Sequence, residues 1–390
     1  MHKKTRRSVA LLVETSLGSG REILRGIANY AHQIDRWQIY HAARGLHDGV
    51  PDWMADWNGD GIIARVQDRE TADALQGFDI PVVDVLGVAD ECGLPLVHVD
   101  DRAIAAQVAE HFKDREFNNF GFYGIEGENW SEKRREGFRE ACGAGELLHT
   151  LETGRGEGDG SEGSRTDLRR WLRQLPTPIA LMVCSDQRGL AVLEACREEG
   201  IAVPERVAIV SVDNDSLLCE VSSPRLSSVR AGHGKVGFEA ARLLDALMAG
   251  APPPSEVILV PPTGVVTRRS SSTNAITDAV VAEGIHFINE NLAAPLTNES
   301  IAKSAGTSRT AFQRRFREAT GMTVREYLVS TRLRRAKSLI EDTTMTLVEI
   351  AEVSGFRHQE YMGSVFKDRL GITPGSLRKA ADRQPQIVSG

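Results

Sequence analysis

Two segments in the last quarter of the 390-residue chain combine apolar residues that could seat a helix with polar residues suited to DNA bases. In the first segment, Phe312 and Phe316 are four residues apart and would share one face of a helix. Arginine suits guanine and glutamine suits adenine, while hydroxyl groups bond to bases or phosphates. The candidate DNA contacts of this segment are Ser308, Arg309, Thr310, Gln313 and Arg314.

The second segment repeats this arrangement about 50 residues later. Tyr361, Val365 and Phe366 are expected to pack against the protein. The candidate base contacts are Arg357, His358, Gln359, Glu360 and Ser364, and Lys367 is a candidate phosphate contact.

Each polar segment follows a shorter helical pattern and a turn. The pattern predicts helices over 298–304 and 309–319, then over 347–353 and 359–370, with a longer helix over 324–341 between the two pairs. Ser308 can cap its helix, and Gly321 can end it. The arginines at 314, 315 and 317 could instead form only a solvated helix face, but the duplication favours two DNA-reading units.

The first 270 residues alternate short β-branched runs with amphipathic helical stretches, which predicts parallel strands in α/β layers. The pattern is long enough for two lobes. The expected strands are 9–13, 37–41, 61–65, 81–86, 96–100, 120–123, 180–184, 207–212, 227–229 and 257–260. The helices expected between them lie near 21–32, 70–76, 103–113, 185–198 and 236–248.

These patterns predict four parts of the chain. Residues 1–270 form the α/β domain, 271–277 a linker, 278–382 an all-α domain beginning with a helix over 278–291, and 383–390 a tail. The glycine-rich stretch 154–164 lacks the lysine and hydroxyl residue that end a P-loop, so we expect a surface loop there.

Charge and composition agree with this division. The net charge is −7, but residues 297–380 carry 15 basic and 9 acidic residues, whereas residues 1–275 carry 31 and 41. Only the tail is therefore expected to meet a polyanion such as DNA. Five cysteines without CxxC spacing and an apolar run of only five residues after the basic start predict a cytoplasmic protein without a membrane span.

The C-terminal part resembles the AraC/XylS family of DNA-binding domains. The matching segments are 296–302, 306–316, 321–323, 332–336, 350–356, 366–367 and 371–374. Met362 stands where phenylalanine is common. This resemblance implies a double helix-turn-helix domain that binds double-stranded DNA as a dimer.

The front part resembles the LacI/GalR-type effector domain, itself similar to periplasmic sugar-binding proteins. The residues that carry the likeness are 123–124, 134–138, 184–186, 210–214, 226–229 and 260–270. Such a sensor followed by an AraC-type tail resembles the regulators of xylose catabolism. The resemblance implies a two-lobed periplasmic-binding-protein-like fold, with D-xylose as the first guess for the effector.

A sugar in such a fold would bind between the lobes, beyond the carboxyl ends of the strands. By resemblance, Arg134 and Asp213 contact the sugar and Asp100 lines the cleft. Weaker candidates from the residues themselves are Glu14, Asp186 and Asn214, which follow expected strands, and Trp130, which could stack on the ring. Each aspartate could instead cap a helix, and Trp130 could belong to the core.

Together these features favour a sugar-responsive, DNA-binding transcription regulator, without a cofactor or bound metal, that activates pentose genes. The alternatives are a cytosolic sugar-binding protein or a sugar-acting enzyme with an accessory basic helical domain. No HExxH, P-loop or GxSxG motif supports an enzyme.

Overall fold

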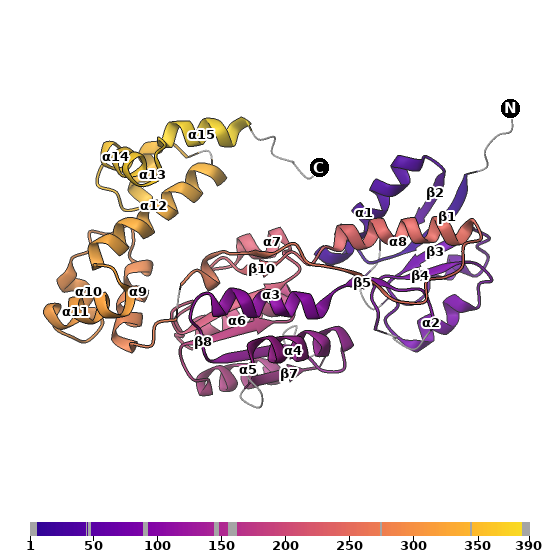
Figure 1. The fold of residues 1–390 in the computed structure, drawn as a ribbon, viewed down its shortest axis with the longest axis horizontal. Coiled ribbons are helices and arrows are strands. Elements are labelled where there is room, and N and C mark those ends of the chain that lie inside the picture. The colour runs from indigo at the N-terminus through magenta and orange to yellow at the C-terminus, as the bar shows by residue number, and fades with distance from the viewer. Residues whose placement is uncertain are drawn as a thin grey trace. The chain divides into compact units, whose positions relative to one another are not determined.

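The computed structural model divides the chain into two compact units, residues 1–275 and 276–390. It describes residues 6–43, 45, 48–88, 93–143, 148–154, 162–273, 275–343 and 345–383 (Figure 1). The first unit is a two-lobed α/β structure and the second is helical, which confirms the expected fold class.

The first lobe is built on a parallel sheet of strand order β2-β1-β3-β4. The strands are β1 (Arg7–Leu12), β2 (Trp37–His41), β3 (Gly61–Ala64) and β4 (Val82–Asp84). A further parallel pair consists of β5 (Val97–Val99) and β11 (Ile258–Val260). The helices are α1 (Gly18–Ile34), α2 (Arg69–Gln76) and α8 (His233–Met248), with a 3-10 turn at Asp52–Met54.

Helices α1 and α8 pack closely in this lobe because small residues let their backbones approach. A Cβ atom on Gly237 of α8 would lie 2.0 Å from the carbonyl oxygen of Ile23 in α1. Any larger residue at 237 would therefore push the two helices apart.

The second lobe contains a sheet of strand order β12-β10-β9-β8-β6-β7, in which only β12 is antiparallel to its neighbour. The strands are β6 (Phe120–Ile125), β7 (His149–Thr153), β8 (Ile179–Val183), β9 (Val207–Val212), β10 (Ser227–Val229) and β12 (Val265–Val266). The helices are α3 (Asp101–Lys113), α4 (Asn129–Cys142), α5 (Glu162–Gln174), α6 (Asp186–Glu198) and α7 (Ser216–Val221), with a 3-10 turn at Arg269–Ser271.

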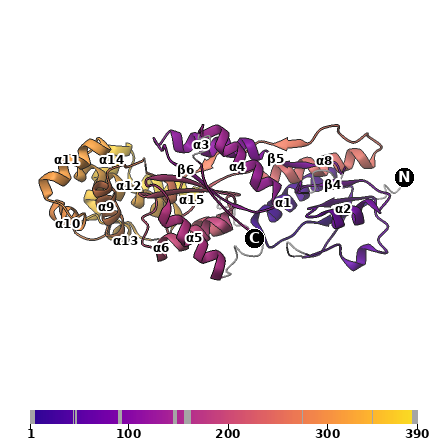
Figure 2. The same cartoon turned by 90° about the horizontal axis from the view of Figure 1, so that it is seen from below.

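Helices cover both faces of this second sheet, with α3 and α4 on one face and α5 and α6 on the other (Figure 2). Strands β8 and β9 are completely buried. Such two-sided burial explains why their sequences are continuous apolar runs rather than alternating ones.

The chain passes between the two lobes at three places: from β5 into α3, from β10 into α8, and from β11 into β12. Hydrogen bonds link these crossings, since Asp100 N–H donates to Val260 O at 2.8 Å and Arg230 N–H donates to Gly264 O at 3.0 Å. The three segments are therefore the only described backbone through which one lobe can turn on the other.

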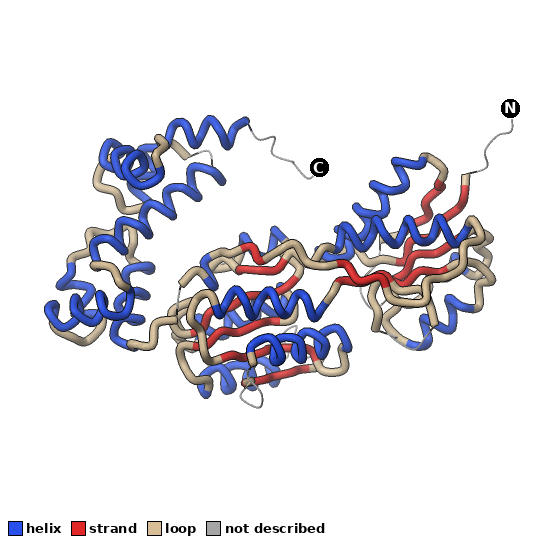
Figure 3. The backbone as a smooth tube through the Cα atoms, viewed as in Figure 1, coloured by secondary structure: helices blue, strands red, loops and turns tan. Residues whose placement is uncertain are grey.

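The described residues of the second unit form helices joined by loops, without strands (Figure 3). These are α9 (Ala279–Glu290), α10 (Asn298–Ser304), α11 (Arg309–Thr320), α12 (Val324–Asp342), α13 (Leu347–Val353), α14 (Gln359–Leu370) and α15 (Pro374–Arg383). One core lies under α9–α11 and another under α12–α14.

Gly355 holds the second turn close to the first core. Its φ is +80°, and a Cβ atom there would lie 2.0 Å from Leu292 O. The side chain of Arg332 in α12 also bonds Leu292 O at 3.2 Å and Ala294 O at 3.0 Å. The two helix-turn-helix units are thus fixed to each other by α12 and by this contact.

The elements differ from the sequence-based prediction in several places. Helices α4, α5, α7 and α15 and strands β7 and β12 were not predicted. Residues 155–161 of the expected glycine-rich loop lie outside the described residues, and its last three residues begin α5. The predicted linker 271–277 is wrong at its start, because Ser271 is buried in the first unit and bonds His111.

Candidate functional site: an interlobe cleft and two recognition helices

Arg134 is the centre of a polar cluster in the second lobe. The residue lies on α4, and only 3% of its surface is exposed. Its Nε donates to Asp101 Oδ1 at 2.8 Å, its Nη1 donates to Cys184 O, and its guanidinium lies 4.9 Å from the centre of the Trp130 ring. Burial acts to lower the pKa of Arg134, but the charges of Asp101 and Asp213 raise it overall.

Asp101 is the partner that the sequence analysis missed. It is the first residue of α3, is buried, and also faces His98 at 3.3 Å. Burial opposes ionisation, but Arg134 and His98 lower the pKa of Asp101. The neighbouring candidate, Asp100, caps α3 by accepting from Ala103 N–H at 2.9 Å. The structure therefore brings Asp101, rather than Asp100, next to Arg134.

Asp213 follows β9 in an unusual backbone conformation. Its φ is +108° and that of Asn214 is +52°, which is a strained arrangement for residues other than glycine. Asp213 Oδ1 lies 2.9 Å from His233 Nε2, at the start of α8. Consecutive strained residues often mark functional sites, because the surrounding structure must hold them in place.

Asp186 and Asn214 are engaged within the chain. Asp186 is fully buried and accepts from Ser211 Oγ, Ser228 Oγ and Asp215 N–H. Burial, and next the charge of Asp213, raise the pKa of Asp186 to about 7. Asn214 Oδ1 accepts from Arg268 at 2.9 Å. Both side chains hold together the loops at the ends of β9 and β10.

Glu14 lies in the first lobe, directly beyond β1. It is buried and bonded to Arg65, which follows β3. Glu14 Oε2 and Arg65 Nε are buried and have no hydrogen-bond partner among the described residues. Since buried polar atoms are normally paired, these two atoms are suited to bonds with the hydroxyl groups of a ligand.

Contacts between the lobes lie beside these groups. Asn129, which precedes Trp130 on α4, donates to Gly87 O beyond β4, and its own buried Oδ1 has no partner in the described part of the chain. Arg21 of α1 pairs with Asp215, the cap of α7, at 3.0 Å. The candidate ligand residues from both lobes thus lie where parallel strands end and the lobes meet.

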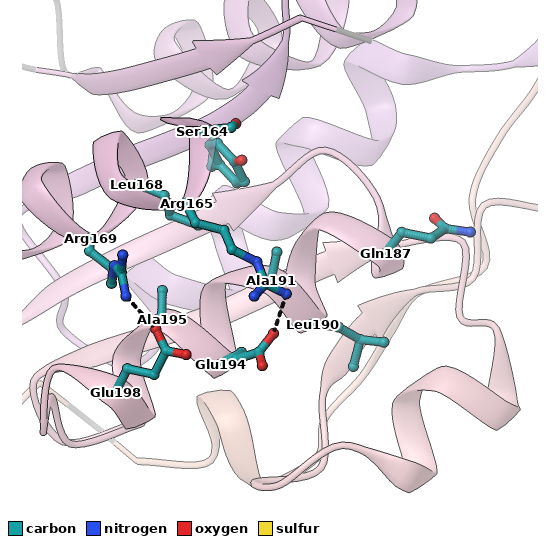
Figure 4. Close-up of a pocket in the computed structure, with 11 residues that line it drawn as sticks. Ser164, Arg165, Leu168, Arg169, Gln187, Leu190, Ala191, Glu194, Ala195 and Glu198 are labelled. Atoms are coloured by element: carbon teal, nitrogen blue, oxygen red, sulfur yellow. Dashed lines mark hydrogen bonds and ion pairs between the residues drawn. The ribbon is translucent and has the colours of Figure 1, made fainter. Parts of the chain in front are cut away.

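A groove of about 260 Å³ lies elsewhere on the second lobe, between α5 and α6. Figure 4 shows that Arg165 and Arg169 reach across it to Glu194 and Glu198, at 3.5 and 3.0 Å. None of the predicted sugar contacts lines this groove, although Gln187, the residue after Asp186, does. The two arginines are already paired with the two glutamates. We therefore do not assign the ligand to this groove.

The first recognition helix, α11, presents its polar residues over a buried apolar seat. Phe312 and Phe316 are fully buried, whereas Arg309, Thr310 and Arg314 are exposed and Gln313 is half-buried. Ser308 caps the helix by accepting from Ala311 N–H at 3.3 Å. Arg315 does not belong to a solvated face alone, because it binds Asp278 through two hydrogen bonds.

The second recognition helix, α14, has a similar buried apolar face. Val365 and Phe366 are buried as expected, but Met362 fills the core position and Tyr361 is 44% exposed. Tyr361 nevertheless packs edge-on against the buried Phe356, as predicted, with their ring centres 6.0 Å apart. The predicted base contacts are exposed, apart from the half-buried Gln359; they are Arg357, His358, Glu360 and Ser364, with Lys367 in the last turn.

Three family models match successive parts of the chain. The XylR N-terminal domain matches residues 8–98, a periplasmic binding protein-like domain matches 109–271, and a helix-turn-helix domain matches 301–380. The xylose operon regulatory protein of Escherichia coli strain K12 is 30% identical over 389 residues, which cover 96% of this chain and 97% of that protein.

The chain belongs to the family of xylose operon regulatory proteins. Another xylose operon regulatory protein, from Haemophilus influenzae, is 28% identical and covers 95% of this chain and 97% of its own length. The solved structure of a xylose-binding transcription activator, 27% identical, covers 97% of this chain and 99% of that chain with a TM-score of 0.83.

Another solved structure matches a smaller share of the chain. A transcriptional regulator bound to cellobiose is 26% identical and covers 69% of this chain and 86% of that chain with a TM-score of 0.55. Within its family, the chain is a sugar-responsive transcription regulator with a helix-turn-helix DNA-binding unit. No described helix has the length and apolar character needed to cross a membrane.

Proposed function

We propose that the chain binds D-xylose between its lobes and, as a cytoplasmic homodimer, activates genes for pentose catabolism. The full-length match to xylose operon regulatory proteins and to a xylose-binding activator supports this choice of sugar and response. The observation that carries the proposal is that Glu14 Oε2, Arg65 Nε and Asn129 Oδ1 are buried near strand ends and have no hydrogen-bond partner among the residues that the structure describes.

The proposed sugar contacts come from both lobes. Arg134, Asp213, Asn129 and the added Asp101 lie in the second lobe, and Glu14 bonded to Arg65 lies in the first. Each sugar hydroxyl can donate and accept, so carboxylates, an amide and guanidinium groups suit it. Trp130, half-buried beside Arg134, offers an aromatic face. Asp100, Asp186 and Asn214 have a supporting role, because their side chains are bonded within the chain.

We assign DNA reading to α11 and α14, which would enter successive major grooves about one helical turn apart. The proposed contacts are Ser308, Arg309, Thr310, Gln313 and Arg314 on the first helix and Arg357, His358, Gln359, Glu360, Ser364 and Lys367 on the second. The exposed Tyr361 joins this set. A homodimer would then cover two half-sites.

The sugar assignment is tested by calorimetric titration and thermal shift with a panel of pentoses and hexoses. A ligand present at 100 times its Kd stabilises the folded form by about 2.7 kcal/mol, so D-xylose is expected to raise Tm selectively. The variant Arg134→Lys should lose most of this binding because lysine cannot replace the bidentate guanidinium.

A matched control is Arg188→Lys. Arg188 is also 3% exposed and lies in the second lobe, but it bonds Tyr123, Thr153 and Gly154 instead of the proposed sugar contacts. Xylose affinity should survive in this variant. A folded protein that responds to none of the sugars would contradict the proposed effector.

We also propose that the chain does not transform its ligand. Its relatives are transcription regulators, and sugar-binding folds need not catalyse. D-xylose incubated with stoichiometric protein should be recovered unchanged by chromatography. A product that accumulates with time and is absent from the heat-denatured control would contradict this proposal and show that the chain is a sugar-acting enzyme.

A further inference from the structure

The described residues on either side of the boundary between the two units are held within their own units. Ala275 N–H, the last residue of the first unit, donates to Arg115 O at 2.8 Å, and Ser271 bonds His111 at 2.9 Å. Ile276, the next residue, is buried in the core of the second unit. Residues held within the two different units, Ala275 and Ile276, are thus neighbours in the sequence.

Asp278 lies two residues further on and has two tasks. Its Oδ1 caps α9 by accepting from Val280 N–H at 2.9 Å and from Val281 N–H at 3.1 Å. The same carboxylate receives Arg315 in a two-pronged pair, with Nε to Oδ2 at 2.6 Å and Nη2 to Oδ1 at 2.8 Å. Arg315 lies on α11, between the proposed base contact Arg314 and the seat Phe316.

The pair contributes little to holding the second unit together. Its side chains are 38% and 22% exposed, and a pair of this kind in contact with solvent stabilises a fold only weakly. The apolar contacts of Phe312 and Phe316 with α9 already hold α11 in place. The bidentate geometry, however, fixes direction as well as distance, because a guanidinium and a carboxylate meet in one plane.

We propose that the Asp278–Arg315 pair transmits the state of the sensor to the first recognition helix. A shift of Ala275 reaches Asp278 within three residues of chain, and the paired guanidinium carries it to α11. Asp278 and Arg315 are positioning residues in this scheme, since they act on the DNA contacts through Arg314 and its neighbours. The inference rests on the proposed response to D-xylose.

The test uses the full chain and the DNA upstream of its own coding sequence. DNA affinity is measured by fluorescence anisotropy with and without saturating D-xylose, and the ratio of the two Kd values gives the coupling. Ratios of about 5 to 150 are typical of allosteric proteins. In Asp278→Asn the cap is kept, because asparagine caps helices as well as aspartate does, but the charge that holds Arg315 is lost.

The ratio is expected to fall toward 1 in Asp278→Asn and in Arg315→Gln, while calorimetric xylose affinity stays within twofold of the unmodified chain. Arg315→Lys, which keeps the charge but not the fork, should retain an intermediate ratio. The matched control is Lys337→Gln, which breaks the exposed Lys337–Glu341 pair on α12 and should leave the ratio unchanged.

The outcomes separate this inference from the proposed function. If the unmodified chain shows a ratio of 1, the sugar response itself fails, and the coupling fails with it. If the unmodified chain responds and both variants respond equally well, the proposed function stands and the role of the Asp278–Arg315 pair is overturned.

Discussion

The two polar regions of this protein handle their charges in opposite ways. In the candidate sugar site, Arg134, Asp101 and Glu14 are buried and bonded to other charged residues. On α11 and α14, residues such as Arg314 and Lys367 are exposed above a separate apolar seat. A small neutral ligand is recognised by hydrogen-bonding groups whose directions are fixed before it binds. DNA carries negative charge, which pairs with basic side chains on an exposed surface.

This difference predicts that substitutions in the candidate sugar site change both the folding stability and the sugar affinity. Substitutions on the recognition helices are expected to change the DNA affinity without changing the folding stability. A substitution in the candidate sugar site should remove a proposed ligand contact and also leave a buried partner unpaired. A substitution on a recognition helix removes a DNA contact and leaves the core intact. The following changes test the contrast, from the largest expected effect to the smallest.

Arg134→Ala should give the largest loss of stability. It leaves Asp101 buried with only His98 beside it, and uncompensated buried charges of this kind cost about 3–5 kcal/mol. Urea denaturation of the first unit, followed by tryptophan fluorescence, measures the loss. A change under 1 kcal/mol would show that the cleft charges are not structurally coupled.

His111 should make the first unit less stable in acid. Burial, and then the charge of Arg115, lower the pKa of His111 to about 3. In the unfolded chain this histidine is protonated below about pH 6.5, whereas in the folded chain it stays neutral down to about pH 3. The free energy of unfolding is therefore highest above pH 6.5 and falls as the pH drops toward 3. The loss is on the order of 3 kcal/mol, allowing for partial solvent exposure.

The variant His111→Gln isolates this effect, because glutamine can still bond Ser271 but does not titrate in this range. Its unfolding free energy between pH 4 and 7 should vary less than that of the unmodified chain. Parallel pH profiles for the two proteins would refute the assignment.

Arg314→Ala should weaken DNA binding by about 1–3 kcal/mol if the side chain reads guanine, and should change stability by less than about 0.5 kcal/mol. Anisotropy titrations and thermal melts on the same samples measure both quantities. Arg170→Ala, which removes an exposed arginine paired with Asp167 on α5, is the control and should affect neither.

Thr346→Ala should lower the stability of the second unit slightly and should leave the DNA contacts in place. Thr346 caps α13 through a capping box with Glu349, and losing such a cap costs about 1 kcal/mol. Thermal unfolding of the second unit measures it. A loss of several kcal/mol would mean that the helix-turn-helix units depend on more than their apolar seats.

Sequence patterns predicted the strands and the recognition helices well, because both depend on the arrangement of apolar and polar residues within a short segment. Runs such as 207–212 must be buried on two faces, and Ser308 and Gly321 mark the ends of α11 as expected. Helices α4 and α5 were missed because charged residues outnumber apolar residues in both of them.

The finer details of the site depend on contacts that no local pattern contains. Asp100 and Asp101 are neighbours, but Asp100 has extended backbone and caps α3, whereas Asp101 is the first residue of the helix and meets Arg134. Within α14, a step of one residue turns the side chain by about 100°, which places Tyr361 at the surface and Met362 in the core. The Arg315–Asp278 pair joins residues 37 positions apart.

The most direct test of the central claim is the DNA affinity of the full chain as D-xylose is titrated into the complex, with L-arabinose as the comparison sugar. Sugar sensing coupled to DNA binding predicts at least about a fivefold change in Kd with D-xylose. It predicts no comparable change with L-arabinose. Equal DNA affinity at every D-xylose concentration, in protein shown by calorimetry to bind the sugar, would contradict it.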